Sequence, residues 1–167
     1  MLFLLTGPEY FNIQSNATKV KVHLRNGIAE ILDQHQDLMG RVDNNLVEVE
    51  TNFENKVEKL LFIVQDAVFV VSNKGLESNK DLPFKEANVN FKGTSVYVYA
   101  KNVRQITSTT TVEEMSKQYD QKNIELEKEI NKLNTSPATT SNARIRLITD
   151  EAEFLRRAVN ILKELKS

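Results

Sequence analysis

Cysteine is absent from this chain, and histidine occurs only twice. Without thiols there can be no disulfide framework, no thiolate metal site and no cysteine nucleophile, so imidazole chemistry is limited to His23 and His35. Glycine is also scarce, and the five glycines stand singly, so there is no glycine-rich loop of the kind that cradles phosphate. These shortages exclude a P-loop nucleotide-hydrolysing core and disfavour most classes of enzyme.

Neither sign of charge dominates, because 22 Lys and Arg stand against 23 Asp and Glu. The net charge of -1 gives no general field that would attract a polyanion, so we expect no nucleic-acid partner. The apolar start, residues 1–5, is far shorter than the roughly 20 residues of a membrane-spanning helix, and we expect no direct membrane insertion. The two histidines show neither metal-ligand spacing nor a nucleophile turn, so we expect no catalytic, cofactor-binding or metal-binding residues.

The first part of the chain, residues 1–106, mainly shows the two-residue apolar alternation of β-strands. Residues 19–24 alternate cleanly, and Asn26-Gly27 is typical of a tight hairpin turn with two positive φ angles before residues 28–32 resume the apolar run. Further expected strands are residues 1–5, 46–51, 57–64, 67–72 and 95–100. Short strands with frequent turns predict a small antiparallel β-sandwich or barrel, interrupted by an insertion loop at about residues 73–94.

From residue 107 onward the apolar spacing becomes helical. Thr111 and Glu114 have the spacing of a capping box, which indicates a helix start. Residues 134–142 include Pro137, which cannot continue a helix comfortably because it lacks an N–H donor, so a bend is expected there. Residues 107–167 therefore form a second domain, an antiparallel helical hairpin, and the predicted fold class is α+β.

Each expected helix carries an apolar seam for the other. In the first helix the seam recurs mainly at every seventh residue, at Val112, Tyr119, Leu126 and Leu133, with Met115 and Ile130 beside it. In the second helix it recurs at spacings of three and four, at Ile145, Ile148, Ala152, Leu155, Val159 and Leu162.

The second helix also carries a further apolar stripe beside its seam. We call this set the second stripe: Leu147, Phe154, Ala158, Ile161 and Leu165. One partner helix cannot cover both the seam and the second stripe. The second stripe is therefore either covered by the β domain or available to another protein.

Two stretches of the chain match the motifs of one known family. Val20-Lys21-Val22, Gly27, Ile31-Leu32, His35 and Leu38 line up with a strand, the motif Gly-Glu-Leu-Gly-Ile-Leu, a Pro-Gly-His and a following Leu. Residues 153–162, which read Glu-Phe-Leu-Arg-Arg-Ala-Val-Asn-Ile-Leu, are similar to a Leu-Arg-Arg-Ala-Leu-Asn-Arg-Leu helix. In this order the motifs resemble the epsilon subunit of the F-type ATP synthase, which is called delta in mitochondria.

The chain also departs from the family's pattern. The Pro-Gly before the family's histidine is Asp33-Gln34 here, and the insertion at about residues 73–94 has no usual counterpart. ATP-binding members begin the first helix with Ile/Leu-Asp-x-x-Arg-Ala and carry two arginines on the second helix. This chain has a different first motif and keeps Arg157 but has Ile161 at the second position. The comparison implies no ATP binding through that site and no cofactor.

The resemblance implies a non-catalytic rotor subunit in the central stalk of a rotary ATPase. Its β domain would bind the gamma subunit and, in the synthase, the membrane ring of c subunits, and its hairpin would contact gamma or the catalytic alpha/beta head and regulate ATP turnover. Expected contacts on the gamma and c-ring side are Ile31, Leu32, His35, Leu38 and Met39. Expected contacts on the second helix are Phe154, Arg156, Arg157, Ile161 and Leu165.

Two alternatives to this interpretation stay open. One is an epsilon-like subunit of a paralogous motor that is not coupled to a proton ring. The other is a free-standing adaptor that uses its helical hairpin for partner capture or homodimerisation. For the rotor subunit we expect a cytoplasmic location, peripheral to the cell membrane as part of the complex.

Overall fold

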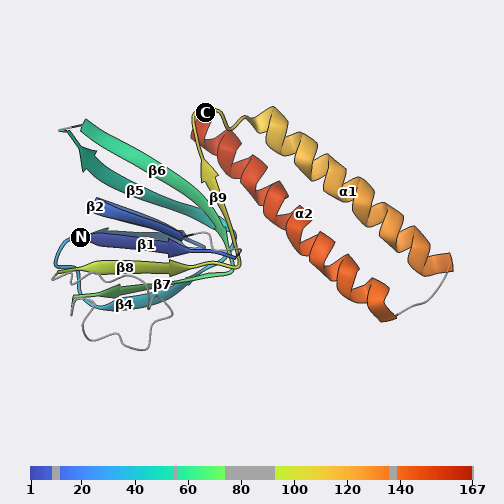
Figure 1. The fold of residues 1–167 in the computed structure, drawn as a ribbon, viewed down its shortest axis with the longest axis horizontal. Coiled ribbons are helices and arrows are strands. Elements are labelled where there is room, and N and C mark those ends of the chain that lie inside the picture. The colour runs from blue at the N-terminus through green and yellow to red at the C-terminus, as the bar shows by residue number, and fades with distance from the viewer. Residues whose placement is uncertain (9–11, 55, 74–92, 136–138, 167) are drawn as a thin grey trace. The chain divides into compact units, whose positions relative to one another are not determined.

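The computed structural model divides the chain into two compact units, Met1–Thr107 and Ser108–Ser167. It describes residues 1–8, 12–54, 56–73, 93–135 and 139–166. Most of the expected insertion loop, residues 74–92, lies outside the described residues. Figure 1 shows a β-stranded first unit and a second unit of two antiparallel helices, which confirms the α+β class.

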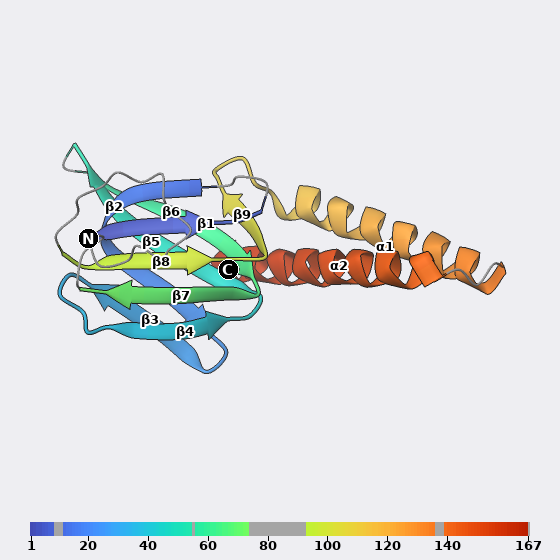
Figure 2. The same cartoon turned by 60° about the horizontal axis from the view of Figure 1, so that its bottom comes forward.

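The first unit contains nine described strands, and eight of them follow one hydrogen-bonded path. The order along the path is β4-β7-β8-β1-β2-β5-β6-β9, and β3 pairs with β2 beside it (Figure 2). The strands are β1 Leu2–Thr6, β2 Asn12–Leu24, β3 Gly27–Leu32, β4 Leu38–Val42, β5 Asn45–Phe53, β6 Lys56–Gln65, β7 Ala67–Ser72, β8 Ser95–Tyr99 and β9 Asn102–Ile106. Among these strands every pair is antiparallel except β1 with β8.

Strand β2 belongs to both layers of the sandwich. Its first residues pair with β1, and its later residues pair with β3 and β5. The register of β2 against β5 shifts between Ala17 and Lys19, and such a shift bends a strand locally. Because of this bend, β2 takes part in both layers. One layer contains β4, β7, β8, β1 and the first part of β2, and the other contains β3, the later part of β2, β5, β6 and β9.

The main core lies between these two layers. It combines fully buried side chains of both, for example Phe3 of β1 and Phe62 of β6, whose rings stack with centroids 6.2 Å apart. The strands β1 and β8 are buried on both faces, since Leu2, Leu4 and Tyr97 form a second cluster away from the main core. Nearly continuous apolar sequences in these two strands fit that burial.

The β2–β3 hairpin is present, but its expected turn chemistry was wrong. Leu24 pairs with Gly27, so the two turn residues are Arg25 and Asn26. Asn26 is not among the residues with positive φ, whereas Gly27 begins β3 with a φ of 153°. Glycine has no Cβ and tolerates this angle, which explains its place at the start of the strand.

Two described strands, β4 and β9, were not expected from the alternation. Both are only five residues long, and β4 contains Gly40 at a position where the core is tight. A Cβ on Gly40 would lie 2.5 Å from Cε1 of Phe69, so only glycine lets β4 approach β7 this closely. The apolar alternation expected of a strand is not visible in the sequence of β4, because Gly40 provides no side chain at an inward position.

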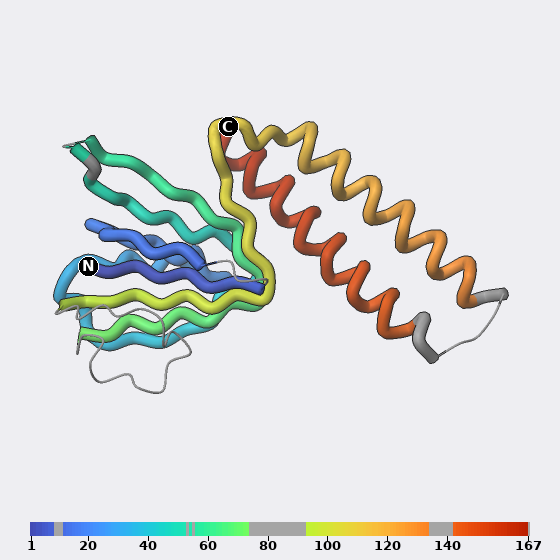
Figure 3. Tube along the Cα trace, viewed as in Figure 1, coloured from blue at the N-terminus to red at the C-terminus, as the bar shows by residue number. Residues whose placement is uncertain are grey.

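The second unit is a hairpin of α1, Val112–Thr135, and α2, Thr139–Lys166 (Figure 3). The Glu114 N–H donates to Thr111 Oγ1 at 3.1 Å, so the expected N-terminal cap is present. The bend was expected to extend to residue 142, but α2 already begins at Thr139, while residues 136–138 lie outside the described part. The extra turn is consistent with tertiary pairing, which outweighs weak local propensity.

Candidate functional site

The strands β3 and β4 and the loop between them carry the residues expected to face gamma and the c ring. Leu32, Leu38 and Met39 are exposed to 49%, 37% and 72%, so they are accessible on the surface. Ile31 is 0% exposed and packs in the main core, so in the chain alone it is not accessible to a partner, and its contact role stays a prediction. Side chains alternate along a strand, and an exposed Leu32 therefore requires an inward Ile31.

Ile28 joins this surface, although the sequence reasoning did not select it. It is 57% exposed and lies four residues before Leu32 on the same face of β3. The alternation in β3 was the signal that could have identified it. We call the exposed residues Ile28, Leu32, Leu38 and Met39 the β3–β4 apolar surface; the name covers exposed positions on two strands and not a single face, because the consecutive Leu38 and Met39 lie on opposite faces of β4.

The loop between β3 and β4, residues 33–37, is fixed by hydrogen bonds from far along the chain. Gln34 has a positive φ of 64°, and its N–H donates to Thr94 Oγ1 at 2.7 Å. Thr94 is buried and its hydroxyl donates to Asn73 Oδ1 at 2.6 Å. The Asn73 N–H donates to Asp37 Oδ1 at 2.9 Å, and its side-chain amide donates to the His35 carbonyl.

Thr94 also interacts with an acidic side chain of the loop. Hydrogen bonding by Thr94 holds the pKa of Asp33 below its ordinary value, because the bond stabilises the carboxylate. His35 is half-buried, and its Nδ1 lies 2.8 Å from the Gln36 carbonyl oxygen. The loop therefore holds the ends of β3 and β4, and with them the β3–β4 apolar surface, in one arrangement.

The expected contact residues on α2 differ in accessibility. Arg156 and Leu165 are exposed, and Arg157 is partly buried with its guanidinium 3.6 Å from a carboxylate oxygen of Glu164. Phe154 and Ile161 are 8% and 3% exposed, so a partner reaches them only after a rearrangement of α2. The second stripe is thus buried in its middle and exposed at its two ends, Leu147 and Leu165.

Charged side chains interrupt the apolar seam between α1 and α2. Ile130 was expected beside the seam but is 42% exposed, whereas its neighbour Glu129 is buried. The helical spacing of three and four places Lys122 and Glu129 in line with Met115 and Leu126. The sequence reasoning missed them because it followed apolar residues alone.

These seam charges belong to an ion-pair ladder across the hairpin. Lys122 Nζ lies 2.6 Å from Glu151 and 2.9 Å from Glu125, and these carboxylates raise the pKa of Lys122. Arg144 lies 3.6 Å from Glu125 and 3.7 Å from Glu129. Such pairs fix how the helices align, because a shift along the axis would separate several of them together.

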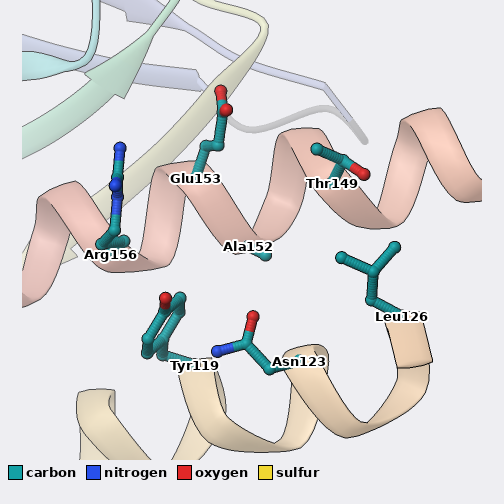
Figure 4. A pocket seen from close by; sticks show the side chains of 7 residues that line it. All are labelled: Tyr119, Asn123, Leu126, Thr149, Ala152, Glu153 and Arg156. Carbon is teal, nitrogen blue, oxygen red and sulfur yellow. The ribbon is translucent and has the colours of Figure 1, made fainter.

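A hollow of about 160 Å³ opens between the two helices. Figure 4 shows Tyr119 and Asn123 of α1 directed toward α2, while Glu153 and Arg156 point away from α1. Leu126 and Thr149 complete the lining. The helices leave this space because small side chains, Ala152 and Thr149, stand where larger ones would fill it.

The described side chains contain no group of three His, Asp or Glu residues placed to hold a metal ion. In the same part of the chain, neither helix is long and apolar enough to cross a membrane. The candidate sites among the described residues are the β3–β4 apolar surface, the exposed residues of α2 and the hollow.

Comparison with known proteins gives similarity at the level of the fold. No protein-family model and no curated protein matches the sequence. The structure is similar to a chain in the cryo-EM structure of the Euglena gracilis mitochondrial ATP synthase, OSCP/F1/c-ring in rotational state 1. That match has a TM-score of 0.50 and 14% identity and covers 95% of this chain and 81% of the other.

A second structure, the central stalk and c ring of the Tetrahymena thermophila mitochondrial ATP synthase, contains a chain with weaker similarity. Its TM-score is 0.41 at 6% identity, with 62% of this chain and 65% of that chain covered. Because the Euglena match covers 95% of this chain, it includes both the β unit and the helical hairpin.

Proposed function

We propose that this chain is a non-catalytic subunit of the central stalk of an F-type rotary ATPase. The observation that carries the proposal is the fold match over 95% of the chain to a component of an ATP synthase structure. The Leu-Arg-Arg-Ala-Val-Asn motif at residues 155–160 lies in α2, where the resemblance to the epsilon subunit requires a helix. Fold and motif support the same family, although they are separate observations.

In this proposal the β3–β4 apolar surface binds another subunit of the rotor. Its four side chains are exposed in the chain alone, so their burial in a complex would favour association. The hydrogen-bonded loop between the strands fixes the surface beforehand, which lowers the entropy lost on binding. The candidate neighbours are gamma and the c ring, which would place the chain at the membrane periphery through the complex.

On α2, Arg156 and Leu165 are the accessible members of the proposed contact with gamma or the catalytic head. Phe154 and Ile161 would join that contact only after α2 rearranges. Such a change in neighbours is how the hairpin would regulate ATP hydrolysis. Removal of residues 108–167 from the assembled complex is expected to increase hydrolysis, measured as phosphate release.

Affinity purification of the full chain from its own cells, followed by mass spectrometry, tests the function. We expect gamma and the catalytic alpha and beta chains in constant proportion to the tagged chain. The variant Leu32→Ser/Met39→Ser should lose most of these partners, whereas Val57→Ser, at a similarly exposed position in β6, should keep them. A stable homodimer without ATPase chains would instead support the free-standing adaptor.

The same preparation separates an ordinary synthase from a motor without a proton ring. Copurification of c-type subunits in detergent would identify the coupled form. Their consistent absence, with gamma and the catalytic chains present, would identify the paralogous motor.

A further inference from the structure

The hollow between α1 and α2 is lined by residues of these two helices, none of which belongs to the second stripe. Residues follow one another by about 100° around a helix, so Asn123 and Thr149 lie on one side of the seam. Glu125, Arg144 and Glu151 of the ion-pair ladder lie on the other side, as does the second stripe on α2. Apart from Arg156, which also belongs to the proposed α2 contact, the residues that line the hollow are not used by the proposed function.

The size and lining of the hollow fit one large side chain. Its volume of about 160 Å³ is close to that of the engineered cavity of about 150 Å³ that accepts benzene. Leu126 and Ala152 provide apolar contact, while Asn123 and the Tyr119 hydroxyl provide polar groups at the edge. A leucine or aromatic side chain would fill this space, as a knob fills a hole between helices.

The two walls beside the hollow carry opposite charge. On α1, Asp120 and Glu127 are exposed on the same side as Asn123. On α2, Arg146 and Arg156 are exposed on the same side as Thr149, with Glu153 as an opposing charge next to Arg156. The hollow thus runs between an acidic wall on α1 and a mainly basic wall on α2.

We propose that this hollow binds an amphipathic α-helix of a partner protein. The helix would insert one leucine or aromatic side chain between Asn123 and Ala152. It would set a basic flank against Asp120 and Glu127 and an acidic flank against Arg146 and Arg156. The charge pattern of the two walls therefore specifies both flanks of the partner helix.

A second copy of the chain fits this surface less well. In a symmetric dimer the acidic wall of one copy meets the basic wall of the other only if the twofold axis runs parallel to the helices. This axis places α1 of one copy over α2 of the other. The same axis places hollow over hollow, so no side chain fills either space. A partner helix, by contrast, fills the hollow with one side chain and places opposite charges against both walls.

Synthetic helical peptides test the proposal on the full-length chain by fluorescence anisotropy at low salt. The first peptide carries leucine and phenylalanine on its apolar face, lysine on one flank and glutamate on the other. Two controls keep the apolar face but carry only lysine or only glutamate on both flanks. We expect the mixed peptide to bind at least tenfold more tightly than either control, and equal binding of all three would overturn the proposal.

Two neighbouring substitutions locate the binding site. Asn123→Trp fills the hollow and should weaken binding of the mixed peptide at least tenfold. Ile124→Trp is its matched control, because Ile124 is 51% exposed on the far side of α1 and should leave binding unchanged. Equal effects of the two variants would overturn the assignment, with circular dichroism checking that helix content is retained.

A surface variant covers the case in which Asn123→Trp disturbs the hairpin. Arg156→Glu leaves the packing intact and should weaken binding of the mixed peptide at least threefold, and an unchanged affinity would contradict the charged-wall assignment. Sedimentation of the chain alone tests the other occupant: a dimer that Asn123→Trp dissociates would assign the hollow to a second copy. None of these outcomes depends on copurification with an ATPase, so this proposal and the proposed function can fail separately.

Discussion

Replacement of Gly40 by alanine tests how closely β4 packs on the core. Gly40 pairs with Phe69 of β7, and an added Cβ would lie 2.5 Å from Cε1 and 2.8 Å from Cζ of that ring. Phe69 is 1% exposed and belongs to the main core, so a shift of its ring would disturb buried neighbours. Overpacking of this kind costs about 1–3 kcal/mol, and we expect the free energy of unfolding to fall by that amount.

The change in the free energy of unfolding caused by Gly40→Ala should reverse its sign when the aromatic ring of Phe69 is removed. In a Phe69→Leu background the clash disappears, and alanine is then favoured over glycine within a strand by about 0.5–1 kcal/mol. Gly40→Ala should therefore destabilise the native chain and stabilise the Phe69→Leu variant. This reversal separates a steric cause from a general intolerance of β4 to substitution.

Urea unfolding of the four chains measures these free energies. The chain has no tryptophan, so tyrosine fluorescence follows unfolding, and Tyr97 and Tyr99 report on the first unit. Equal costs of Gly40→Ala in both backgrounds, or no cost in the native chain, would refute the packing argument. Met39 adjoins Gly40, so a displaced β4 should also reduce recovery of the proposed rotor partners.

Three further predictions concern the hairpin and the loop. The hydrogen bond from Lys132 lowers the pKa of Glu129 in the folded chain. The stability that this bond contributes is therefore present above the ordinary pKa of 4.5 and is lost as the pH falls through the lower folded pKa. Glu129→Gln should reduce this loss of stability in acid, measured by thermal melts. Thr111→Ala should destabilise α1 by about 1 kcal/mol in urea unfolding, whereas Thr111→Ser should be nearly neutral. Thr94→Val leaves the Gln34 N–H without its acceptor and should cost about 1–3 kcal/mol, while Thr94→Ser should retain most stability; equal losses would contradict the role of the hydroxyl.

Strand and helix patterns predicted much of the architecture. The alternation at residues 19–24 and the glycine at position 27 were sufficient for the β2–β3 hairpin, although the turn used Arg25 and Asn26. The capping spacing at Thr111 predicted the start of α1, which the hydrogen bond to Glu114 confirms. The hairpin and the helix start depend on residues that are close together in the sequence, so the local sequence is enough to predict them.

The candidate site was less predictable. Leu32, Leu38 and Met39 were expected at a binding surface and are exposed, whereas Ile31 was expected there and is buried. Their binding role stays a prediction. The loop that holds them depends on Thr94, which is 60 residues from Gln34, and no local pattern indicates that partnership.

The amino-acid sequence alone determined the succession of a β unit and a helical hairpin, because strand and helix each have their own apolar period. Only the tertiary structure decided which side chains meet: it brought Thr94 to the loop before β4 and Glu129 into the seam, and it left the hollow between Asn123 and Ala152. The physical reason is that the period of a strand or helix fixes on which face of that element a residue lies. The partner that covers that face is chosen by packing, hydrogen bonding and charge between segments far apart in the chain.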